Sequence, residues 1–207
     1  MILEKLIVGM LATNCYIFGS EKSKEVVIID PGEESDRIMT MIDNNSLIPL
    51  AILLTHGHFD HTRAMRALIR TYQIPLMYNE KDKSIVKKEA GRWLFEGDIV
   101  KVDEFNLHVL ETPGHSPGSL CFYTKDIKFY KDFPVDGILF SGDLIFRRSI
   151  GRSDFEGGNQ KLLFESIKNK IMYNEDLSDN FIIFPGHMGN TTIGEERTMN
   201  LFKNYFL

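Results

Sequence analysis

Short apolar runs, half of which end at glycine, proline or aspartate, alternate along the chain with stretches of helical periodicity. Short runs rich in β-branched and aromatic residues predict strands, and apolar positions repeated every three or four residues predict helices. The predicted strands are 2–8, 15–18, 26–29, 51–54, 76–78, 99–102, 107–110, 120–123, 137–140 and 181–184. The predicted helices are 35–44, 62–72, 80–95, 159–169 and 193–203. This alternation is typical of a layered α/β domain.

One segment departs from this rhythm. Residues 126–136 are rich in lysine, aspartate and aromatic side chains, and we expect an extended hairpin or a loop there. The chain has no low-complexity stretch, internal repeat or linker that would divide it. Its 207 residues, of which 43% are hydrophobic, are enough for one full core. We therefore predict a single domain over 1–207.

Composition excludes several classes of protein. A formal net charge of −5 argues against nucleic acid as a partner, because nucleic-acid-binding proteins concentrate positive charge on one face. No apolar run approaches the length that crosses a membrane. The apolar stretch 6–12 follows Glu4 and Lys5, whose charges cancel, so it does not resemble a signal peptide. Cys15 and Cys121 each lie in an apolar run, which argues against a disulfide. We expect a cytoplasmic protein, and no pattern predicts its oligomeric state.

Four potential metal ligands lie within six residues directly after the strand 51–54. They are His56, His58, Asp60 and His61. In extended backbone, the first two side chains project to the same side, while the last two fall where the chain enters a helix. Four adjacent ligands rarely close around one tetrahedral ion. The spacing therefore favours two neighbouring ions, and a chance clustering of half the chain's six histidines is a poor alternative.

Three further candidates each follow a strand and stand in a turn of small residues. His115 follows Pro113-Gly114, Asp143 follows Ser141-Gly142, and His187 follows Pro185-Gly186. Loops at strand ends can converge at one edge of a sheet, so these side chains can join the first four. Any one of them alone would be read as an ordinary turn or core residue. The remaining histidine, His108, lies inside a strand, and we expect a structural role for it.

With these motifs in register, the chain resembles the metallo-β-lactamase superfamily over nearly its whole length. The resemblance implies a four-layer αββα sandwich of the α+β or α/β class, with a site for two divalent metal ions at one edge. It assigns His56, His58 and His115 to the first ion, Asp60, His61 and His187 to the second, and Asp143 as a bridge. Zinc is expected, with iron or manganese as alternatives. Asp30 is a candidate support for the metal loops, or a plain turn residue.

Within this superfamily the chain is most similar to short glyoxalase II-like hydrolases, which act on hydroxyacyl thioesters of glutathione. Four stretches support this: 13–16, 29–32, 149–155 and 192–197. The resemblance implies that a metal-bound hydroxide attacks a small-molecule thioester such as a lactoyl conjugate, with Asp60 orienting the nucleophile or moving its proton. Full-length glyoxalase II enzymes use a C-terminal helical region to bind glutathione. Because only about twenty residues follow His187, another thiol carrier stays open.

Several alternatives stay open at this point. A lactonase or phosphodiesterase of the same fold is one; a lactonase would favour a proton donor, for which Tyr123 and Tyr130 are candidates. An iron-dependent persulfide oxidoreductase and a non-catalytic binding module are others, although the complete ligand set argues against both. An aspartate rather than a cysteine at 143 argues against most true β-lactamases. For contacts to an anionic thiol carrier, the candidates are Arg147, Arg148 and Arg152, which follow Asp143 and are otherwise ordinary surface arginines.

Overall fold

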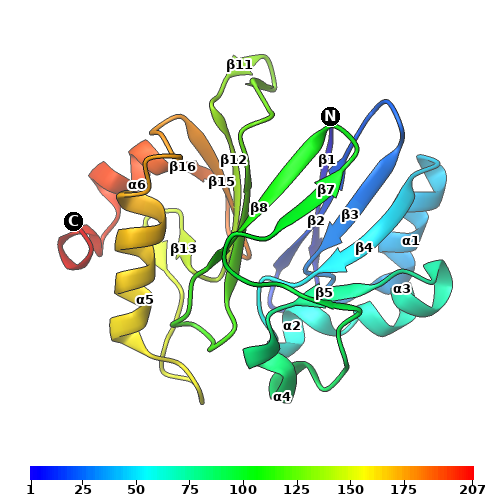
Figure 1. Cartoon of the computed structure of the whole chain (residues 1–207), viewed down its shortest axis with the longest axis horizontal. Coiled ribbons are helices and arrows are strands. Elements are labelled where there is room, and N and C mark those ends of the chain that lie inside the picture. Colours follow the sequence, from blue (N-terminus) through cyan, green and yellow to red (C-terminus); the bar gives the residue numbers. More distant parts are fainter.

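Two six-stranded sheets pack face to face between two layers of helices. The computed structural model describes residues 1–207, and Figure 1 shows α1 and α3 outside one sheet and α5 and α6 outside the other. The strand order is β1-β2-β3-β4-β5-β6 in the first sheet and β16-β15-β12-β9-β8-β7 in the second. The predicted αββα sandwich is confirmed.

The strands of the first sheet are β1 Ile2–Val8, β2 Thr13–Gly19, β3 Glu25–Ile29, β4 Ile48–Leu53, β5 Leu76–Tyr78 and β6 Arg92–Trp93. Those of the second are β7 Ile99–Val102, β8 Phe105–Glu111, β9 Leu120–Thr124, β12 Gly137–Gly142, β15 Phe181–Pro185 and β16 Thr191–Thr192. Two small ribbons pair β10 Phe129–Tyr130 with β11 Phe133–Pro134 and β13 Ile145–Phe146 with β14 Ser149–Ile150. The predicted hairpin within 126–136 is thus confirmed.

The α-helices are α1 Ser35–Asn44, α2 Phe59–Thr62, α3 Met65–Tyr72, α4 Lys83–Val86, α5 Gln160–Ser166 and α6 Ile193–Met199. Two 3₁₀ turns, η1 Glu80–Asp82 and η3 Lys203–Tyr205, and a π-helical turn, η2 Ile167–Met172, complete the set. No helix of the chain combines the length and the apolar character needed to cross a membrane.

Strands buried on both faces explain why the apolar runs are continuous rather than alternating. In β3, Val26 and Ile28 belong to the core beneath α1 and α3, whereas Val27 and Ile29 belong to the core between the sheets. A third core lies between the second sheet and α5 and α6, with Ile183 and Leu163 among its members. Side chains of successive residues point to opposite faces of a strand, so a strand in the middle of a sandwich must be apolar at every position.

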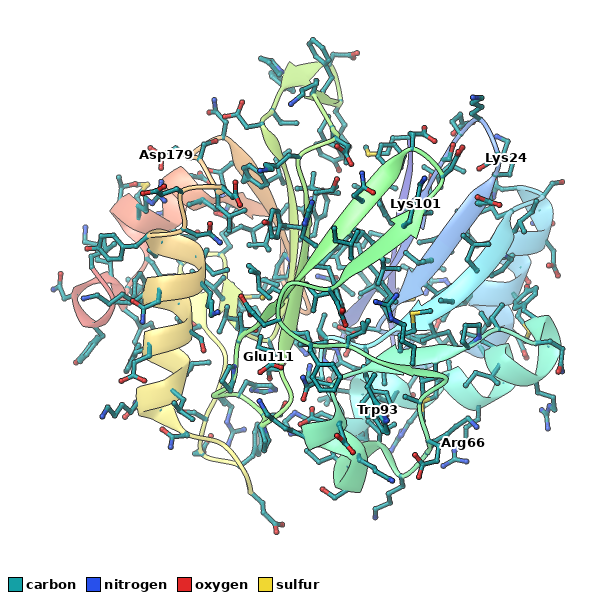
Figure 2. All side chains as sticks on the ribbon, in the orientation of Figure 1. Lys24, Arg66, Trp93, Lys101, Glu111 and Asp179 are labelled. Carbon is teal, nitrogen blue, oxygen red and sulfur yellow. The ribbon has the colours of Figure 1, made fainter.

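The helix predicted over 80–95 is wrong beyond Val86. The backbone of Lys87 adopts a left-handed conformation, with φ 54, which ends α4 after one turn. Trp93, labelled in Figure 2, then joins the sheet as part of β6. Its ring packs edge-on against Tyr78, with 5.0 Å between the ring centres. Pairing with β5 buries the apolar surface of this segment better than a continued, highly charged helix would.

Other predicted helices differ from the structure at their ends. The helix predicted over 62–72 is shorter at its start, since Thr62 ends α2 and α3 begins at Met65, and the helices predicted over 159–169 and 193–203 begin within one residue of the predicted position. The helix predicted over 159–169 continues as the π-helical turn η2, and the helix predicted over 193–203 ends at Met199. Helix 35–44 matches α1.

Candidate metal centre

The densest ligand segment follows β4 and turns directly into α2. His58, in extended conformation with ψ 150, is the residue before the first turn of α2, and Asp60 and His61 lie within that turn. The imidazoles of His56 and His61 are 1% and 0% exposed, which is far more burial than surface histidines show. The strand-to-helix turn thus holds all four side chains at the edge of the sandwich.

The first three predicted ligands meet through their ring nitrogens. Nε2 of His115 lies 3.2 Å from Nε2 of His56 and 2.9 Å from Nδ1 of His58. Tetrahedral bonds of about 2.0 Å to one zinc ion would separate two nitrogens by roughly 3.3 Å. Two of the three separations are close to this value and all three nitrogens lie within 4.8 Å of one another, so they can hold a single ion; we refer to these residues as the first trio.

Asp60, His61 and His187 form a second trio beside the first. Oδ2 of Asp60 lies 3.4 Å from Nε2 of His61 and 3.3 Å from Nε2 of His187. The hydroxyl of Thr13 donates to the same carboxylate oxygen at 3.0 Å. This trio offers one carboxylate and two imidazoles to an ion, a donor set that suits zinc, iron and manganese.

Asp143 lies between the two trios. Its Oδ2 is 3.5 Å from Nε2 of His115 and 3.5 Å from Nε2 of His187, while its Oδ1 is 3.5 Å from Nε2 of His61. Since one carboxylate faces histidines of both groups, it has the position of a bridging ligand. The structure thus brings together all seven residues that the sequence proposed as ligands.

Two buried atoms of this cluster support metal binding directly. Nε2 of His61 and Oδ1 of Asp143 are shielded from solvent and have no hydrogen-bond partner. Buried polar atoms are almost always paired, because an unpaired one costs about 1–3 kcal/mol. A cation held between them would satisfy both, so the cluster fits two divalent ions.

The opposite nitrogens of these histidines are fixed by hydrogen bonds. Nδ1 of His61 contacts Oδ2 of Asp30 at 2.9 Å, Nδ1 of His115 contacts the Arg152 carbonyl at 2.6 Å, and Nδ1 of His187 contacts the Leu11 carbonyl at 3.1 Å. Since carbonyl and carboxylate oxygens accept, these nitrogens donate, which leaves each Nε2 as the nitrogen that can bind a metal ion.

Asp30 lies where it can support the metal-binding loop after β4, as the resemblance implied. Its carboxylate accepts from the backbone N–H of Thr55 at 2.8 Å and from the Thr55 hydroxyl at 2.6 Å, in addition to His61. Asp30 also lies within ligand distance of His56 and His61. Because its oxygens are already occupied by these three donors, we interpret it as a support for the loop rather than a ligand.

Charge differs between the two trios. Burial, reinforced by the neighbouring imidazoles, lowers the pKa of His56 and His58, which favours the neutral form that binds metals. Burial also lowers the pKa of His187, but hydrogen bonds to Asp143 and Asp60 outweigh it and raise the pKa to about 10. Burial raises the pKa of Asp143 and of Asp60, yet the histidines and other hydrogen-bond donors bring both below the usual value.

Of the three arginines, one lies beside the cluster. The guanidinium of Arg152 stacks 4.4 Å above the ring of Phe155, whose edge packs against His58 at 5.3 Å, and it pairs with Asp154. Arg148 extends instead toward Glu195, 3.9 Å away, and Arg147 is exposed. Phe155 was not among the sequence candidates; the available signals were its place three residues after Arg152, whose carbonyl contacts His115, and its position at the end of the family-like stretch 149–155.

The tyrosines considered as proton donors do not reach the metal centre. The hydroxyl of Tyr123 donates to Asp176 at 3.2 Å, and the ring of Tyr130 packs on Phe184. His108 stacks on Tyr123 at 5.0 Å, in keeping with its expected structural role.

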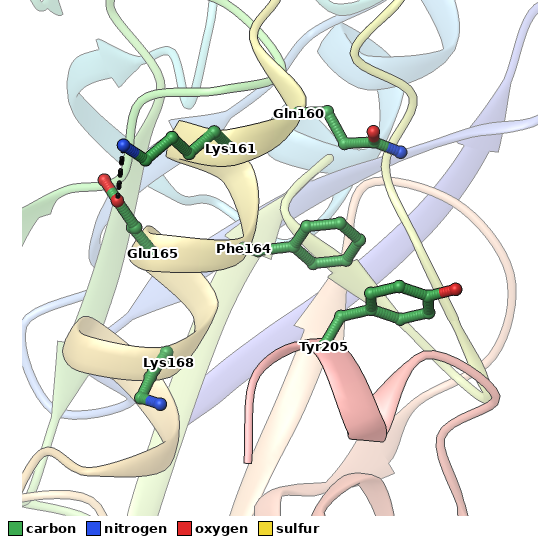
Figure 3. A pocket seen from close by; sticks show the side chains of 6 residues that line it. All are labelled: Gln160, Lys161, Phe164, Glu165, Lys168 and Tyr205. Carbon is green, nitrogen blue, oxygen red and sulfur yellow. Dashed lines mark ion pairs between the residues drawn. The ribbon is translucent and has the colours of Figure 1, made fainter.

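A pocket of about 370 Å³ lies elsewhere, between α5 and the C-terminal turn η3. Figure 3 shows Phe164 and Tyr205 facing one another there, with stacked rings 5.0 Å apart, and the ion pair of Lys161 and Glu165 beside them. None of its lining residues is a candidate ligand, so this pocket is separate from the metal centre.

Known proteins are similar to this chain in sequence. Hydroxyacylglutathione hydrolase GloC of Haemophilus influenzae is 34% identical over 222 residues, covering 99% of each chain. The mitochondrial persulfide dioxygenase of Mus musculus is 30% identical, covering 97% of this chain and 75% of the relative. Because the chain is similar to this dioxygenase, a redox activity is an alternative to hydrolysis that an assay must test.

Solved structures agree with the fold. The BLEG-1 B3 metallo-β-lactamase has a TM-score of 0.86 and 34% identity, covering 98% of this chain and 99% of that one. A di-iron-bound form of TTHA1623 has a TM-score of 0.81 and 32% identity, covering 96% and 99%. The model of the metallo-beta-lactamase superfamily matches residues 8–187. The chain, with its metallohydrolase fold and its His/Asp site, therefore belongs to the metallo-β-lactamase superfamily.

Proposed function

We propose that the protein hydrolyses acyl thioesters, with 2-hydroxyacyl conjugates of a small thiol, such as a lactoyl thioester, as its substrate class. The observation that carries this proposal is the position of Asp143 between the two trios, 3.5 Å from His115 and from His187. The substrate class is supported by the 34% identity to hydroxyacylglutathione hydrolase GloC.

Two bound ions would polarise the thioester carbonyl and lower the pKa of water toward neutrality. The protein's own groups would then orient the reactants. Asp60 is 8% exposed and its Oδ2 accepts a hydrogen bond from Thr13, so its carboxylate is held in place within the second trio. We assign to Asp60 the orientation of the attacking water and the transfer of its proton.

The leaving group explains why the site needs no further acid. A thiol has a pKa of about 8.5, so a thiolate departs without a strong proton donor. The hydroxyls of Tyr123 and Tyr16 are engaged elsewhere, with Asp176 and with the Pro185 carbonyl. This arrangement suits a thioester better than a lactone, whose alkoxide leaving group is far more basic.

The thiol carrier would contact Arg152 and Phe155 at the side of the first trio. Phe155 is 41% exposed, and its ring lies between the guanidinium and His58. An anionic carrier would have to share Arg152 with Asp154, which already holds it by two hydrogen bonds of 2.9 and 2.8 Å. Arg152 is therefore our candidate for carrier selectivity, whether the carrier is glutathione or another small thiol.

We expect zinc as the resident metal, with iron or manganese as alternatives, and the cytoplasm as the compartment. The two cysteines are buried and free, and the chain forms no disulfide, in keeping with a reducing compartment. Small-molecule thioesters, rather than nucleic acid or membranes, are the proposed partners.

A substrate panel with the metal-loaded protein tests the proposal. The panel contains lactoyl-glutathione, a lactoyl ester of a second small thiol, a lactone, a phosphodiester and a β-lactam, and oxygen uptake is followed with glutathione persulfide. We expect hydrolysis of the thioesters and no oxygen uptake. Cleavage confined to another ester class, or oxygen consumption with the persulfide alone, would show that the substrate assignment is wrong.

A further inference from the structure

A buried carboxylate outside the predicted ligand set joins the loops of the first trio. Asp82, the last residue of η1, is 0% exposed. Its Oδ2 accepts from the backbone N–H of Gly57 at 2.8 Å and from the hydroxyl of Ser116 at 2.7 Å. Its Oδ1 accepts from the backbone N–H of Gly118 at 2.7 Å. One side chain therefore connects two loops that are about sixty residues apart in sequence.

Two of the three donors to Asp82 lie directly next to ligands of the first trio, and the third lies three residues after one. Gly57 is the residue between His56 and His58, Ser116 follows His115, and Gly118 lies in the same turn as Ser116. None of them neighbours a residue of the second trio. By contrast, the Asp30 carboxylate accepts from Thr55 and contacts His61. Asp30 is thus connected to both trios, through His61 and through Thr55, which precedes His56, whereas Asp82 is connected only to the loops of the first trio.

The space around Asp82 leaves it little freedom. A Cβ atom on Gly118 would lie 2.7 Å from Oδ1 of Asp82, and one on Gly57 would lie 3.0 Å from the side chains of Ile85 and Val86 in α4. Glycine at both positions lets each backbone approach the carboxylate. Since the carboxylate cannot move without breaking these contacts, it fixes the distance between the His56–His58 loop and the His115 loop.

We propose that Asp82 is a positioning residue for the first metal: it holds His56, His58 and His115 at the separation that one ion needs, and it acts on the second metal only indirectly. This role follows from the donors of Asp82 and is independent of the thioester substrate proposed above. Residues that support metal ligands through hydrogen bonds contribute about 10–100-fold to metal affinity.

The test compares Zn²⁺ affinity in two backgrounds, using competition with a chelator. His187→Ala disrupts the second trio, so the one Zn²⁺ ion that still binds reports on the first trio. His58→Ala disrupts the first trio, so the ion that still binds reports on the second. In the His187→Ala background, we expect Asp82→Asn to weaken Zn²⁺ binding by about 10–100-fold. In the His58→Ala background, we expect a change of less than about threefold, which is within the ordinary variation of such effects.

A matched control separates positioning from loss of stability. Glu196 is also a fully buried carboxylate that accepts three hydrogen bonds, from Thr191, Asn200 and the backbone N–H of Arg148. Glu196→Gln should destabilise the fold, as Asp82→Asn does, but leave Zn²⁺ affinity in both backgrounds unchanged. Thermal unfolding of the metal-free variants shows that the two losses of stability are comparable.

Three results would overturn the proposal: unchanged affinity in the His187→Ala background, equal losses in both backgrounds, or the same loss for Glu196→Gln. If Asp82→Asn does not fold, Ser116→Ala takes its place, because it removes one of the three donors and keeps the carboxylate. We expect Ser116→Ala to weaken Zn²⁺ binding by about 10-fold, the lower end for residues that support metal ligands, in the His187→Ala background only. The Zn²⁺ affinity measurements use no substrate, so they test the role of Asp82 even if the thioester assignment is wrong.

Discussion

Nε2 of His61 faces Oδ1 of Asp143 across 3.5 Å, and both atoms are buried without a hydrogen-bond partner. The other carboxylate oxygen of Asp143 faces His115 and His187. A buried imidazole and a buried carboxylate in this arrangement are best satisfied by cations. Asp143 is therefore the residue through which loss of one ion should affect the other.

Asp143→Asn should lower both metal content and activity. An amide retains the shape of the side chain but loses the charge that two cations would share. We expect the protein to retain fewer than two ions per chain and kcat/KM for a thioester to fall by more than about 100-fold, the upper limit for residues that only support ligands. Asp176→Asn, which changes a carboxylate paired with Lys125 on the surface, is the control and should retain both. Full metal content in Asp143→Asn would contradict the bridging role.

The metal-free protein should lose stability as the pH rises from about 6.5 to about 10. Asp143 and Asp60 raise the pKa of His187 from 6.5 to about 10 despite its burial, so the folded state binds a proton that the unfolded state releases. The contribution of this proton is complete below pH 6.5 and is lost by about pH 10. Thermal unfolding of the metal-free protein across this range measures it.

His187→Gln is the control for this pH dependence. Glutamine cannot be protonated, so the decrease in melting temperature between pH 6.5 and pH 10 should be smaller in the variant. Bound metal should also reduce the decrease, because a coordinated imidazole holds no proton at that nitrogen. An equal decrease in the wild-type and variant metal-free proteins would mean that other groups cause it.

Gly151→Ala should disrupt the metal centre by steric conflict. A Cβ atom at Gly151 would lie 1.7 Å from the carbonyl oxygen of Asp143, so the backbone that carries the bridging carboxylate would have to move. We expect the free energy of unfolding to fall by about 3 kcal/mol, the upper end for overpacking, together with loss of bound metal. Gly189→Ala, where a Cβ atom meets nothing within 4 Å, should be neutral in both denaturant unfolding and metal analysis.

Asp30→Asn should weaken the second trio more than the first. Asp30 accepts from Thr55 and contacts Nδ1 of His61, and an amide cannot accept all three hydrogen bonds. The free energy of unfolding should fall by about 1–3 kcal/mol, the cost of leaving a buried donor unpaired. In a His58→Ala background, Zn²⁺ affinity should fall by about 10–100-fold. A stable variant with unchanged affinity would show that Asp30 is an ordinary turn residue.

The ligands could be predicted because they stand in short segments that follow apolar strands, a pattern that is local in sequence. Asp82 could not, since it lies among charged residues, Glu80 to Lys83, that are typical of a solvated helix. Its partners are 25 to 36 positions away, and only the folded chain brings Gly57 and Gly118 to its carboxylate. The helix predicted over 80–95 was wrong for a similar reason, because pairing of Trp93 with the sheet outweighs local helical propensity.

Metal analysis of the purified protein, combined with a thioester assay, tests the central claim most directly. The account predicts about two divalent ions per chain, loss of thioester hydrolysis when a chelator removes them, and recovery when Zn²⁺, Fe²⁺ or Mn²⁺ is returned. His58→Ala should retain fewer ions and little activity. A metal-free protein that hydrolyses the thioester at the full rate would contradict the assignment of this chain as a dinuclear metallohydrolase.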